Sequence, residues 1–330
     1  MNIGVLSTAN IGRKCVIPAI SETEATALAV ASRDRERAEE AAETHAIPCA
    51  YGSYDALLAD EDLDAVYNPL PNALHAEWTK RAADAGLDVL CEKPLGVDAA
   101  ESRKMTDYCE QQGVMLMEAF MYRYHPRTKR AAEIARSELG DLRHVDAAFH
   151  FALPDREDIR LDPSLAGGSL MDVGCYAVTA VRLFLGEPAW VSATATDRRD
   201  CGVETSLTGL LGFENGATAA ISSGFDASLQ QYTVVGSEGR LSVDQAFVPH
   251  GETTLTCSTD NRDVAETFEA VDQYRCEVEA FIEAVRTGEP PTTDGEQAVR
   301  TMEVIDALYE SVERGGRVHL GEAGASGGHQ

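Results

Sequence analysis

The sequence has few lysines and far fewer basic than acidic residues. Among its 330 residues, 28 are Lys or Arg and 55 are Asp or Glu, a formal net charge of −27. Five of the 28 basic residues are lysine and the other 23 are arginine. This balance disfavours nucleic acid as a partner, because binding it requires basic side chains that neutralise phosphates. It indicates the hydrated, carboxylate-rich surface of a halophile's protein, where salt screens the repulsion between carboxylates.

Clustered cysteines and long apolar runs are also missing. No two of the eight cysteines are closer than 18 residues, which excludes a Cys-x-x-Cys zinc or redox site and a small disulfide scaffold. Because cysteine and histidine form no ligand cluster, no metal is expected. No apolar run reaches the roughly 18 residues that span a bilayer, and the N-terminus lacks the features of a signal peptide. We therefore expect a cytoplasmic protein without a membrane partner.

What the sequence does have is a globular composition, 44% hydrophobic, in two parts of different texture. Residues 1-120 alternate short apolar runs with longer amphipathic stretches, which predicts βαβ units in a doubly wound parallel Rossmann sheet. Its strands are expected at 2-6, 25-31, 65-68, 88-91 and 114-118, and its helices after residue 12 and at 35-45, 75-85 and 99-112.

Residues 121-330 predict a second, α+β domain on a mostly antiparallel sheet. A hairpin signal, Glu214-Asn215-Gly216, separates two of the strand-like runs. The last helix is a candidate for packing back onto the first domain. The expected strands are 145-151, 190-196, 206-213, 217-223, 231-235 and 240-244, and the expected helices are 176-185, 273-286 and 297-314.

The first stretch with chemical meaning is GVLSTANIG at 4-12. Ser7, Ala9 and Gly12 occupy the positions of a G-x-G-x-x-G turn, where small residues let backbone N–H groups approach a pyrophosphate. An ordinary βα turn is the alternative, but the place between the first strand and a helix favours a cofactor site. The predicted contacts are Ser7, Thr8, Ala9, Asn10, Ile11 and Gly12.

The end of the second strand predicts which nicotinamide cofactor binds. An acidic residue there would bind the ribose 2′-OH of NAD, whereas this chain has Ser32 followed by Arg33, which suits the 2′-phosphate of NADP. We therefore expect NADP rather than NAD. The alternative, favoured for Arg35 and Arg37, is that these arginines begin a charged surface helix.

CEKP at 91-94 follows the fourth expected strand, at the carboxyl edge of the sheet where such folds bind ligands. The ammonium of Lys93 could stabilise a developing alkoxide and lower the pKa of a neighbouring acid. Pro94 restricts Lys93 to an extended backbone and is compatible with a cis peptide bond. A salt-bridged surface lysine is the alternative interpretation.

GGSLMDVGCY at 167-176 places a carboxylate and a phenol four residues apart. If a helix has begun there, Asp172 and Tyr176 lie on one of its faces and can point at one spot. Alternatively, Asp172 is a helix cap and Tyr176 is a core aromatic residue.

These stretches, with PNALH at 71-75 and EAFMYRYHPR at 118-127, together resemble the glucose–fructose oxidoreductase / inositol 2-dehydrogenase (Gfo/Idh/MocA) family of NAD(P)-dependent sugar oxidoreductases. The resemblance spans nearly the whole chain. It implies a Rossmann domain at 1-120, a substrate-binding and oligomerisation domain at 121-330 with a large open sheet, and a site in the cleft between them. A homodimer or homotetramer through that sheet is expected.

The resemblance also implies roles for individual residues. Lys93 would be the catalytic lysine, Asp172 the substrate-orienting carboxylate and Tyr176 the proton-transfer residue, where many members have histidine. In Tyr176 and the S-T-A-x-I turn, the chain resembles the branch of the family that contains NADP-dependent D-xylose 1-dehydrogenases and dihydrodiol dehydrogenases. Near the cofactor the family pattern places Pro71, Asn72, His75, Glu92 and Lys93.

Three of these assignments are less direct. His75 could instead be a surface residue at a helix N-terminus. Arg123 could reach the cofactor or the substrate, or tie the two domains together, and Tyr122 is a candidate substrate contact with Lys93, Asp172 and Tyr176. We expect residues that set substrate specificity in loops such as 153-165.

The predicted activity is oxidation of the C1 hydroxyl of a cyclic aldose, such as D-xylose, to the lactone with NADP. Tyr176 would take the hydroxyl proton as hydride leaves, and Lys93 would supply the cation, so that no metal is needed. The same residues could reduce a keto- or deoxyosone sugar or oxidise a trans-dihydrodiol. From another functional class, the chain could be a non-catalytic NADP-binding sensor.

Overall fold

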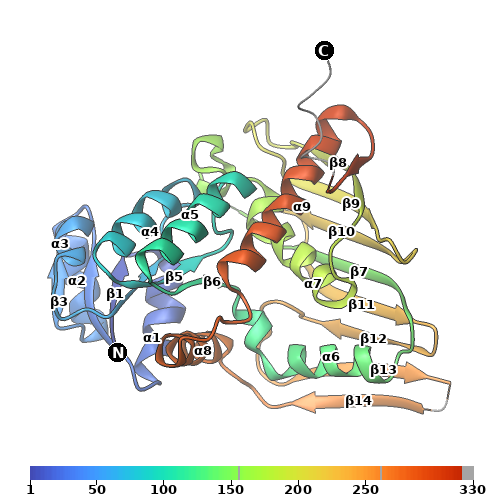
Figure 1. The fold of residues 1–330 in the computed structure, drawn as a ribbon, viewed down its shortest axis with the longest axis horizontal. Coiled ribbons are helices and arrows are strands. Elements are labelled where there is room, and N and C mark those ends of the chain that lie inside the picture. The colour runs from blue at the N-terminus through green and yellow to red at the C-terminus, as the bar shows by residue number, and fades with distance from the viewer. Residues whose placement is uncertain (155–156, 261, 322–330) are drawn as a thin grey trace. The chain divides into compact units, whose positions relative to one another are not determined.

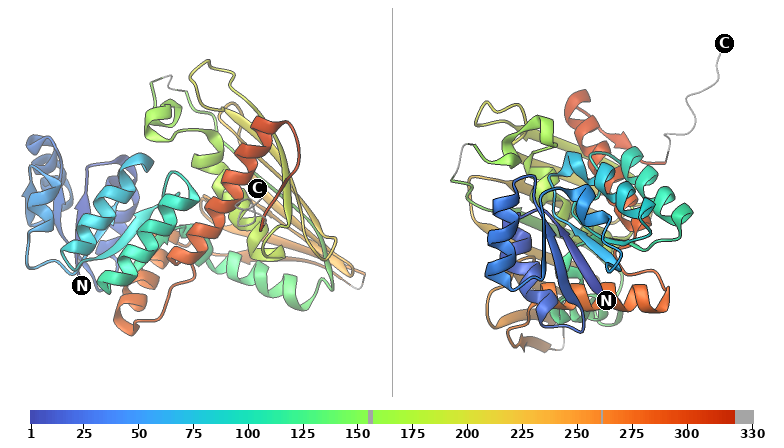
Figure 2. Two further views of the ribbon diagram at one scale, coloured as in Figure 1. Left: turned by 45° about the horizontal axis from the view of Figure 1, so that its top comes forward. Right: turned by 90° about the vertical axis from the view of Figure 1, so that its left-hand side faces the viewer.

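The computed structural model describes residues 1–154, 157–260 and 262–321, which form two compact units (Figures 1 and 2). The first unit contains Met1–His125 and Asp272–Val299. The second contains Pro126–Val271 and the chain from Arg300 onward. The first unit therefore extends five residues beyond the expected boundary at 120, and a segment from near the end of the chain belongs to it.

The first unit is built on a six-stranded sheet with the order β3-β2-β1-β4-β5-β6, in which all strands are parallel. This is the strand order of dinucleotide-binding doubly wound folds, so the predicted Rossmann architecture is confirmed. The sequence did not reveal β3, which has only three residues, none of them fully buried. The strands are β1 (Asn2–Leu6), β2 (Thr26–Ala31), β3 (Cys49–Tyr51), β4 (Ala65–Asn68), β5 (Asp88–Glu92) and β6 (Leu116–Ala119).

Helices cover both faces of this sheet (Figure 2) and create one apolar core on each side. One core contains residues of α1 (Ile17–Ser21), α2 (Arg35–His45) and α8 (Gln273–Thr287). The other contains residues of α3 (Tyr54–Leu58), α4 (His75–Asp84) and α5 (Ala99–Gln112). Because Val278 and Phe281 of α8 are fully buried in the first of these cores, the late segment is an integral part of the Rossmann unit.

The second unit contains a nine-stranded sheet with the order β14-β13-β12-β11-β7-β10-β9-β8-β15. Among the described strands of this nine-stranded sheet, only β7 and β10 pair in parallel. The prediction of a large, mostly antiparallel sheet is therefore confirmed. The predicted hairpin joins β9 to β10, and Gly216 there has φ of +81°. The strands are β7 (Leu142–His150), β8 (Trp190–Thr196), β9 (Ser206–Gly212), β10 (Thr218–Gly224), β11 (Leu229–Gly236), β12 (Gly239–Asp244), β13 (Thr253–Thr259), β14 (Arg262–Phe268) and β15 (Val318–His319).

Two helices of the second unit pack on this sheet. A π-helical turn at Leu170–Gly174 leads into α7 (Cys175–Leu185), which packs on β7, β10 and β11, while α6 (Pro126–Ser137) packs on β12 and β13 (Figure 1). The helical stretch Pro163–Leu185 is long and apolar enough to cross a membrane, which corrects the expectation that no run has that length. The most apolar 18-residue segment of this stretch is 78% buried within the protein, as in a core helix. The last helix, α9 (Gly295–Arg314), begins in the first unit and continues in the second.

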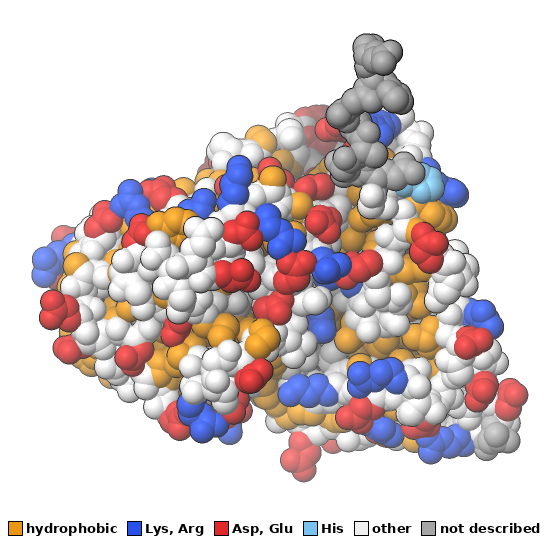
Figure 3. All heavy atoms as spheres, viewed as in Figure 1, with side chains coloured by type: hydrophobic (Ala, Val, Ile, Leu, Met, Phe, Trp, Pro, Cys, Tyr) orange, Lys and Arg blue, Asp and Glu red, His pale blue; other side chains and the backbone are white. Residues whose placement is uncertain are grey.

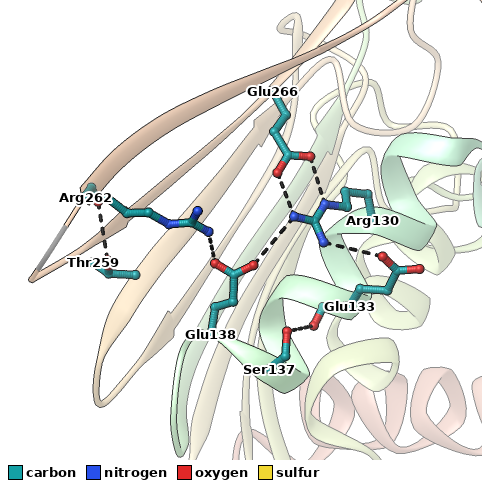
Figure 4. A network of polar contacts seen from close by, with 7 residues as sticks. All are labelled: Arg130, Glu133, Ser137, Glu138, Thr259, Arg262 and Glu266. Atoms are coloured by element: carbon teal, nitrogen blue, oxygen red, sulfur yellow. Dashed lines mark hydrogen bonds and ion pairs between the residues drawn. The ribbon is translucent and has the colours of Figure 1, made fainter.

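Charged side chains are spread over the surface, with acidic and basic groups interspersed in the view of Figure 3. Many arginines are used in ion pairs, and Figure 4 shows a group of them at the edge of the nine-stranded sheet. Arg130 of α6 donates two hydrogen bonds of 2.8 Å to Glu266 of β14, and Glu138 pairs with both Arg130 and Arg262. Such two-pronged bonds suit the planar guanidinium and not the lysine ammonium. None of the eight cysteines, all of which the structure describes, forms a disulfide bond.

Candidate active site

The turn after β1 has the geometry expected for binding a dinucleotide. Ser7 has φ of 107°, a conformation that usually requires glycine, and its hydroxyl oxygen accepts a hydrogen bond of 3.2 Å from the N–H of Ala9. The Nε atom of Arg13 is buried and has no hydrogen-bond partner among the described residues. The close turn at Ser7 is compatible with the expected pyrophosphate site, and the contacts of Ser7 to Gly12 with a cofactor stay predictions.

The two residues predicted to bind a 2′-phosphate lie at the end of β2. Ser32 is buried, and its hydroxyl oxygen accepts a hydrogen bond of 3.2 Å from the N–H of Asp34. Arg33 is exposed and donates a hydrogen bond to Tyr54, which opposes the rise in the pKa of that hydroxyl caused by burial. Arg35 and Arg37 instead form surface ion pairs on α2, as the alternative interpretation holds for those two.

Lys93 lies in a turn at the carboxyl end of β5 that two buried side chains hold in place. The Lys93–Pro94 peptide bond is cis. Glu118 of β6 is 2% exposed, and its Oε1 accepts a hydrogen bond of 2.8 Å from the N–H of Leu95. The Nδ1 atom of His75 lies 2.9 Å from the carbonyl oxygen of Pro94. The backbone on the C-terminal side of Lys93 is thus fixed from two directions.

His75 also fixes the loop that follows β4. Its ring is 0% exposed, and Nε2 lies 2.7 Å from the carbonyl oxygen of Leu70. Burial lowers the pKa of His75. The structure therefore excludes the alternative of a surface residue and places a carbonyl oxygen beside each ring nitrogen, of which the neutral ring donates to one. Contact of His75 with the cofactor stays a prediction. The nearby Pro71 and Asn72 are partly exposed at the start of α4.

Glu92 is oriented by a buried tyrosine. The hydroxyl of Tyr67 in β4 donates a hydrogen bond of 2.6 Å to Oε1 of Glu92. Glu277 of α8 lies in the same interior region, and burial, followed by the charge of Glu92, raises its pKa well above the ordinary value. Tyr67 therefore orients the carboxylate of Glu92, whose charge acts on Glu277.

In the second unit, Asp172 forms an ion pair with an arginine from the loop before it. Nε of Arg160 donates a hydrogen bond of 2.8 Å to Oδ2 of Asp172, and Nη1 donates one of 3.1 Å to Asp158. The charge of Asp172 is the largest cause of a raised pKa at Arg160. Arg160 also lies over the ring of Phe151, 5.8 Å from its centre. Asp172 sits within the π-helical turn and is not its N-cap.

Tyr176 follows Asp172 at the first turn of α7 and is held by aromatic packing. Its side chain is largely buried, with the residue 4% exposed. Its ring packs edge-on against Phe149 at 5.3 Å between ring centres and contacts Phe247 at 5.6 Å. The structure therefore gives Tyr176 a fixed orientation, which suits a core aromatic residue and a catalytic phenol equally.

The two glycines before this turn are required by close contacts. A Cβ atom on Gly167 would lie 2.4 Å from the carbonyl oxygen of Arg160. Gly168 has φ of +121°, and a Cβ there would lie 2.5 Å from Oε2 of Glu204. The segment that leads to Asp172 is thus packed between Arg160 and Glu204.

The sequence did not identify these supporting residues. Arg160 lies in the stretch 153-165, where specificity residues were expected, and Asp155 and Arg156 of that stretch lie outside the described residues. Glu118 could have been suspected as a charged residue in an apolar strand, but nothing in the sequence marks Glu204. Of the remaining candidates, Tyr122 is 0% exposed beside Phe120 and Arg123 is partly exposed. Their contacts with substrate and cofactor stay predictions.

Comparisons with known proteins agree with this geometry. Residues 1–120 match the model of the Gfo/Idh/MocA oxidoreductase family with an NAD-binding Rossmann fold, and residues 129–242 match a Gfo/Idh/MocA C-terminal domain. The chain is 56% identical to D-xylose 1-dehydrogenase (NADP(+)) 2 of Haloferax volcanii, over 97% of this chain and 100% of that one.

Two solved structures are also similar to the chain. One is KijD10, a 3-ketoreductase from Actinomadura kijaniata in complex with NADP and TDP-benzene, with 33% identity, a TM-score of 0.88 and coverage of 94% of this chain and 97% of that one. The other is aldose-aldose oxidoreductase from Caulobacter crescentus complexed with glycerol, with 29% identity, a TM-score of 0.91 and coverage of 97% and 99%. Together with the Rossmann strand order and the Lys93 turn, these matches show that the chain belongs to the Gfo/Idh/MocA family of oxidoreductases.

Proposed function

We propose that the protein is an NADP-dependent dehydrogenase that oxidises the C1 hydroxyl of a cyclic aldose, D-xylose or a similar pentose, to the lactone. The observation that carries the proposal is the turn at Lys93. The fold uses two buried polar side chains, His75 and Glu118, to set the backbone next to a single lysine at the carboxyl edge of the sheet. The similarity to the Haloferax enzyme supports the choice of substrate and of NADP.

Each of these residues has its own role in the proposed reaction. NADP supplies the hydride acceptor. Lys93 places a positive charge beside the reacting hydroxyl and so favours its alkoxide, while Tyr176 takes the proton. Asp172, held by Arg160, accepts hydrogen bonds from the sugar. Arg33 and the Ser7 turn bind the cofactor phosphates.

A second candidate is reduction of a keto sugar by the same residues, which the similarity to the 3-ketoreductase favours. It uses the same hydride and proton transfers in the opposite direction. Oxidation of a trans-dihydrodiol is a further variant. The two candidates differ in the substrate that reacts, and a panel of substrates separates them.

The test is a screen of aldoses, inositols and keto sugars with NADP and NAD in molar salt, on the wild-type protein and the Tyr176→Phe variant. We expect NADPH formation with a pentose, and a loss of orders of magnitude in turnover in the variant while NADP binding survives. Cofactor binding without turnover of any substrate would instead identify a non-catalytic sensor. Near-normal turnover in the variant would remove Tyr176 from the mechanism.

We also infer the cellular environment and the oligomeric state of the enzyme from its surface. The net charge of −27 supports a salt-rich cytoplasm. Leu210 in β9 is 54% exposed on the nine-stranded sheet, which supports a homodimer or homotetramer through that sheet. Light scattering after size-exclusion chromatography in molar salt measures the mass, and a Leu210→Glu variant should shift it towards that of the monomer.

A further inference from the structure

Glu204, in the connection between β8 and β9, has an unusual environment for a carboxylate. No basic side chain among the described residues pairs with it, and the N–H and hydroxyl groups that donate to it are neutral. Its Oε1 accepts a hydrogen bond of 2.6 Å from the N–H of Leu170 and one of 3.5 Å from the hydroxyl of Ser169. The hydroxyl of Tyr309 in α9 lies 3.3 Å from both carboxylate oxygens.

These contacts place the carboxylate at the beginning of a helix. The first N–H groups of a helix lack partners within it, and a negative charge there is favourable. Ser169, at the N-cap position, makes no side-chain capping bond, so Glu204 supplies the cap from a distant part of the chain. The backbone agrees, because the carbonyl oxygen of Glu204 accepts a hydrogen bond of 2.9 Å from the N–H of Ser169.

The capped turn carries the two proposed reactive residues of this unit. Asp172 is two residues after Leu170 and Tyr176 is six residues after it, so a shift of the helix start moves both. The sequence also permits the close approach of the Glu204 carboxylate to the chain before the helix. A glycine, Gly168, lies there, and a Cβ atom at this position would collide with the carboxylate.

We propose that Glu204 is a positioning residue for the reaction, which fixes the start of the helix that presents Asp172 and Tyr176. The inference rests on the proposed function of those two residues. Glu204 acts through the backbone N–H of Leu170, and Tyr309 orients the carboxylate from α9.

The environment also makes the contact sensitive to pH. The ionisable groups close to Glu204 are the Tyr309 hydroxyl, whose pKa burial raises well above its ordinary value, and, beside that hydroxyl, the Cys175 thiol. Burial raises the pKa of Glu204 to about 6. Below that pH the carboxyl gains a proton and loses the charge that favours the helix N-terminus, so turnover should fall as the pH drops through about 6.

The experiment compares Glu204→Ala and Glu204→Gln with Glu266→Gln as a matched control, since Glu266 is an acid in the ion-pair network at the sheet edge. For each variant, kcat and KM are measured with the sugar from pH 5 to 9, and NADP affinity is measured by fluorescence. We expect Glu204→Ala to lose about 10- to 100-fold in kcat with NADP affinity within about twofold, because misplaced reactive groups cost turnover. Glu204→Gln, which keeps an acceptor for Leu170 but has no charge, should resemble the protonated wild type, with a kcat at pH 8 no higher than that of the wild type at pH 5 and no inflection near pH 6.

Hydrogen exchange of residues 169-176 gives a readout that does not require turnover. Exchange there should be faster in Glu204→Ala and unchanged in Glu266→Gln. Unchanged exchange and unchanged kcat in Glu204→Ala would overturn the proposal, as would an inflection near pH 6 that persists in Glu204→Gln. If exchange responds as expected while Tyr176→Phe has normal turnover, positioning by Glu204 stands and the catalytic assignment of Tyr176 fails.

Discussion

In the two units, the residues proposed for catalysis are held by different kinds of interaction. In the first unit, His75 and Glu118 are almost fully buried and direct their polar atoms at the main chain of the Lys93 turn. In the second unit, a partly exposed ion pair between Arg160 and Asp172 is added to a backbone contact of the same kind, in which Glu204 accepts a hydrogen bond from a helix N–H. Buried hydrogen bonds to the backbone respond little to salt, whereas a partly exposed ion pair is screened by it. The comparison predicts that the two parts respond differently to substitution, salt and pH.

The largest effect is expected at Lys93, where the first unit contributes its charge. Lys93→Met should lower kcat by about 10²- to 10⁴-fold, because the developing alkoxide loses its cation. NADP affinity should change much less. Steady-state kinetics and a binding titration measure the two quantities, and Lys104→Met on the exposed side of α5 is the control. A variant at Lys93 with nearly normal kcat would show that the turn is structural only.

His75→Ala tests the buried backbone contacts of the first unit. Removing the ring deprives one of the buried carbonyl groups of Leu70 and Pro94 of its donor, which should cost about 1–3 kcal/mol of unfolding free energy. Because the Lys93 turn loosens, kcat should fall by about 10-fold. Urea unfolding and kinetics at 0.5 M and 3 M salt are the measurements. The ratio of the variant's kcat to the wild-type kcat should be the same at both salt concentrations. A strong salt dependence of this ratio would contradict the proposed contrast between the units.

Arg160→Ala tests the ionic support of the second unit. Asp172 would lose its bond from Nε and with it part of its orientation, so KM for the sugar should rise by about 10-fold with a smaller loss in kcat. Arg160→Lys should recover only part of the affinity, because an ammonium cannot reproduce the two directed bonds to Asp172 and Asp158. Equal KM values for wild type and both variants would remove Arg160 from the site.

The smallest effect is the pH dependence of stability that comes from Glu204. Its pKa rises from an ordinary 4.5 to about 6 on folding. A raised pKa of an acid stabilises the folded state below pH 4.5, and this contribution disappears as the pH rises through 6. Wild type should therefore gain up to about 2 kcal/mol over Glu204→Gln between pH 7.5 and pH 4.5. Urea unfolding at both values measures the gain, and parallel curves for the two proteins would refute the shift.

The sequence revealed the parts of this site that lie in continuous motifs. The Rossmann sheet, the open antiparallel sheet, Lys93, Asp172 and Tyr176 could be predicted because apolar periodicity and short motifs are local properties. Glu204 and Tyr309 could not be predicted, because they come from distant segments of the chain. Glu204 lies 34 residues after Leu170, and Tyr309 lies further along the chain. Strands β13 and β14 were also missed, since their outward-facing residues are polar and leave no apolar run.

The assignment of α8 to the first unit shows the same limit. The sequence predicts the helix but not its partners, because its amphipathic pattern says which face is buried and not against what. Only the fold shows that Val278 and Phe281 complete the core beside the cofactor turn.

The most direct test of the central claim follows the hydrogen at C1 of the sugar. The wild-type protein is supplied with NADP and D-xylose that carries deuterium at C1, in molar salt, and the products are analysed by mass spectrometry and NMR. The proposed mechanism predicts deuterium at C4 of the reduced nicotinamide and a xylonolactone that lacks it. Reduced cofactor without deuterium, or bound NADP that is not reduced in the presence of D-xylose and related pentoses, would contradict it.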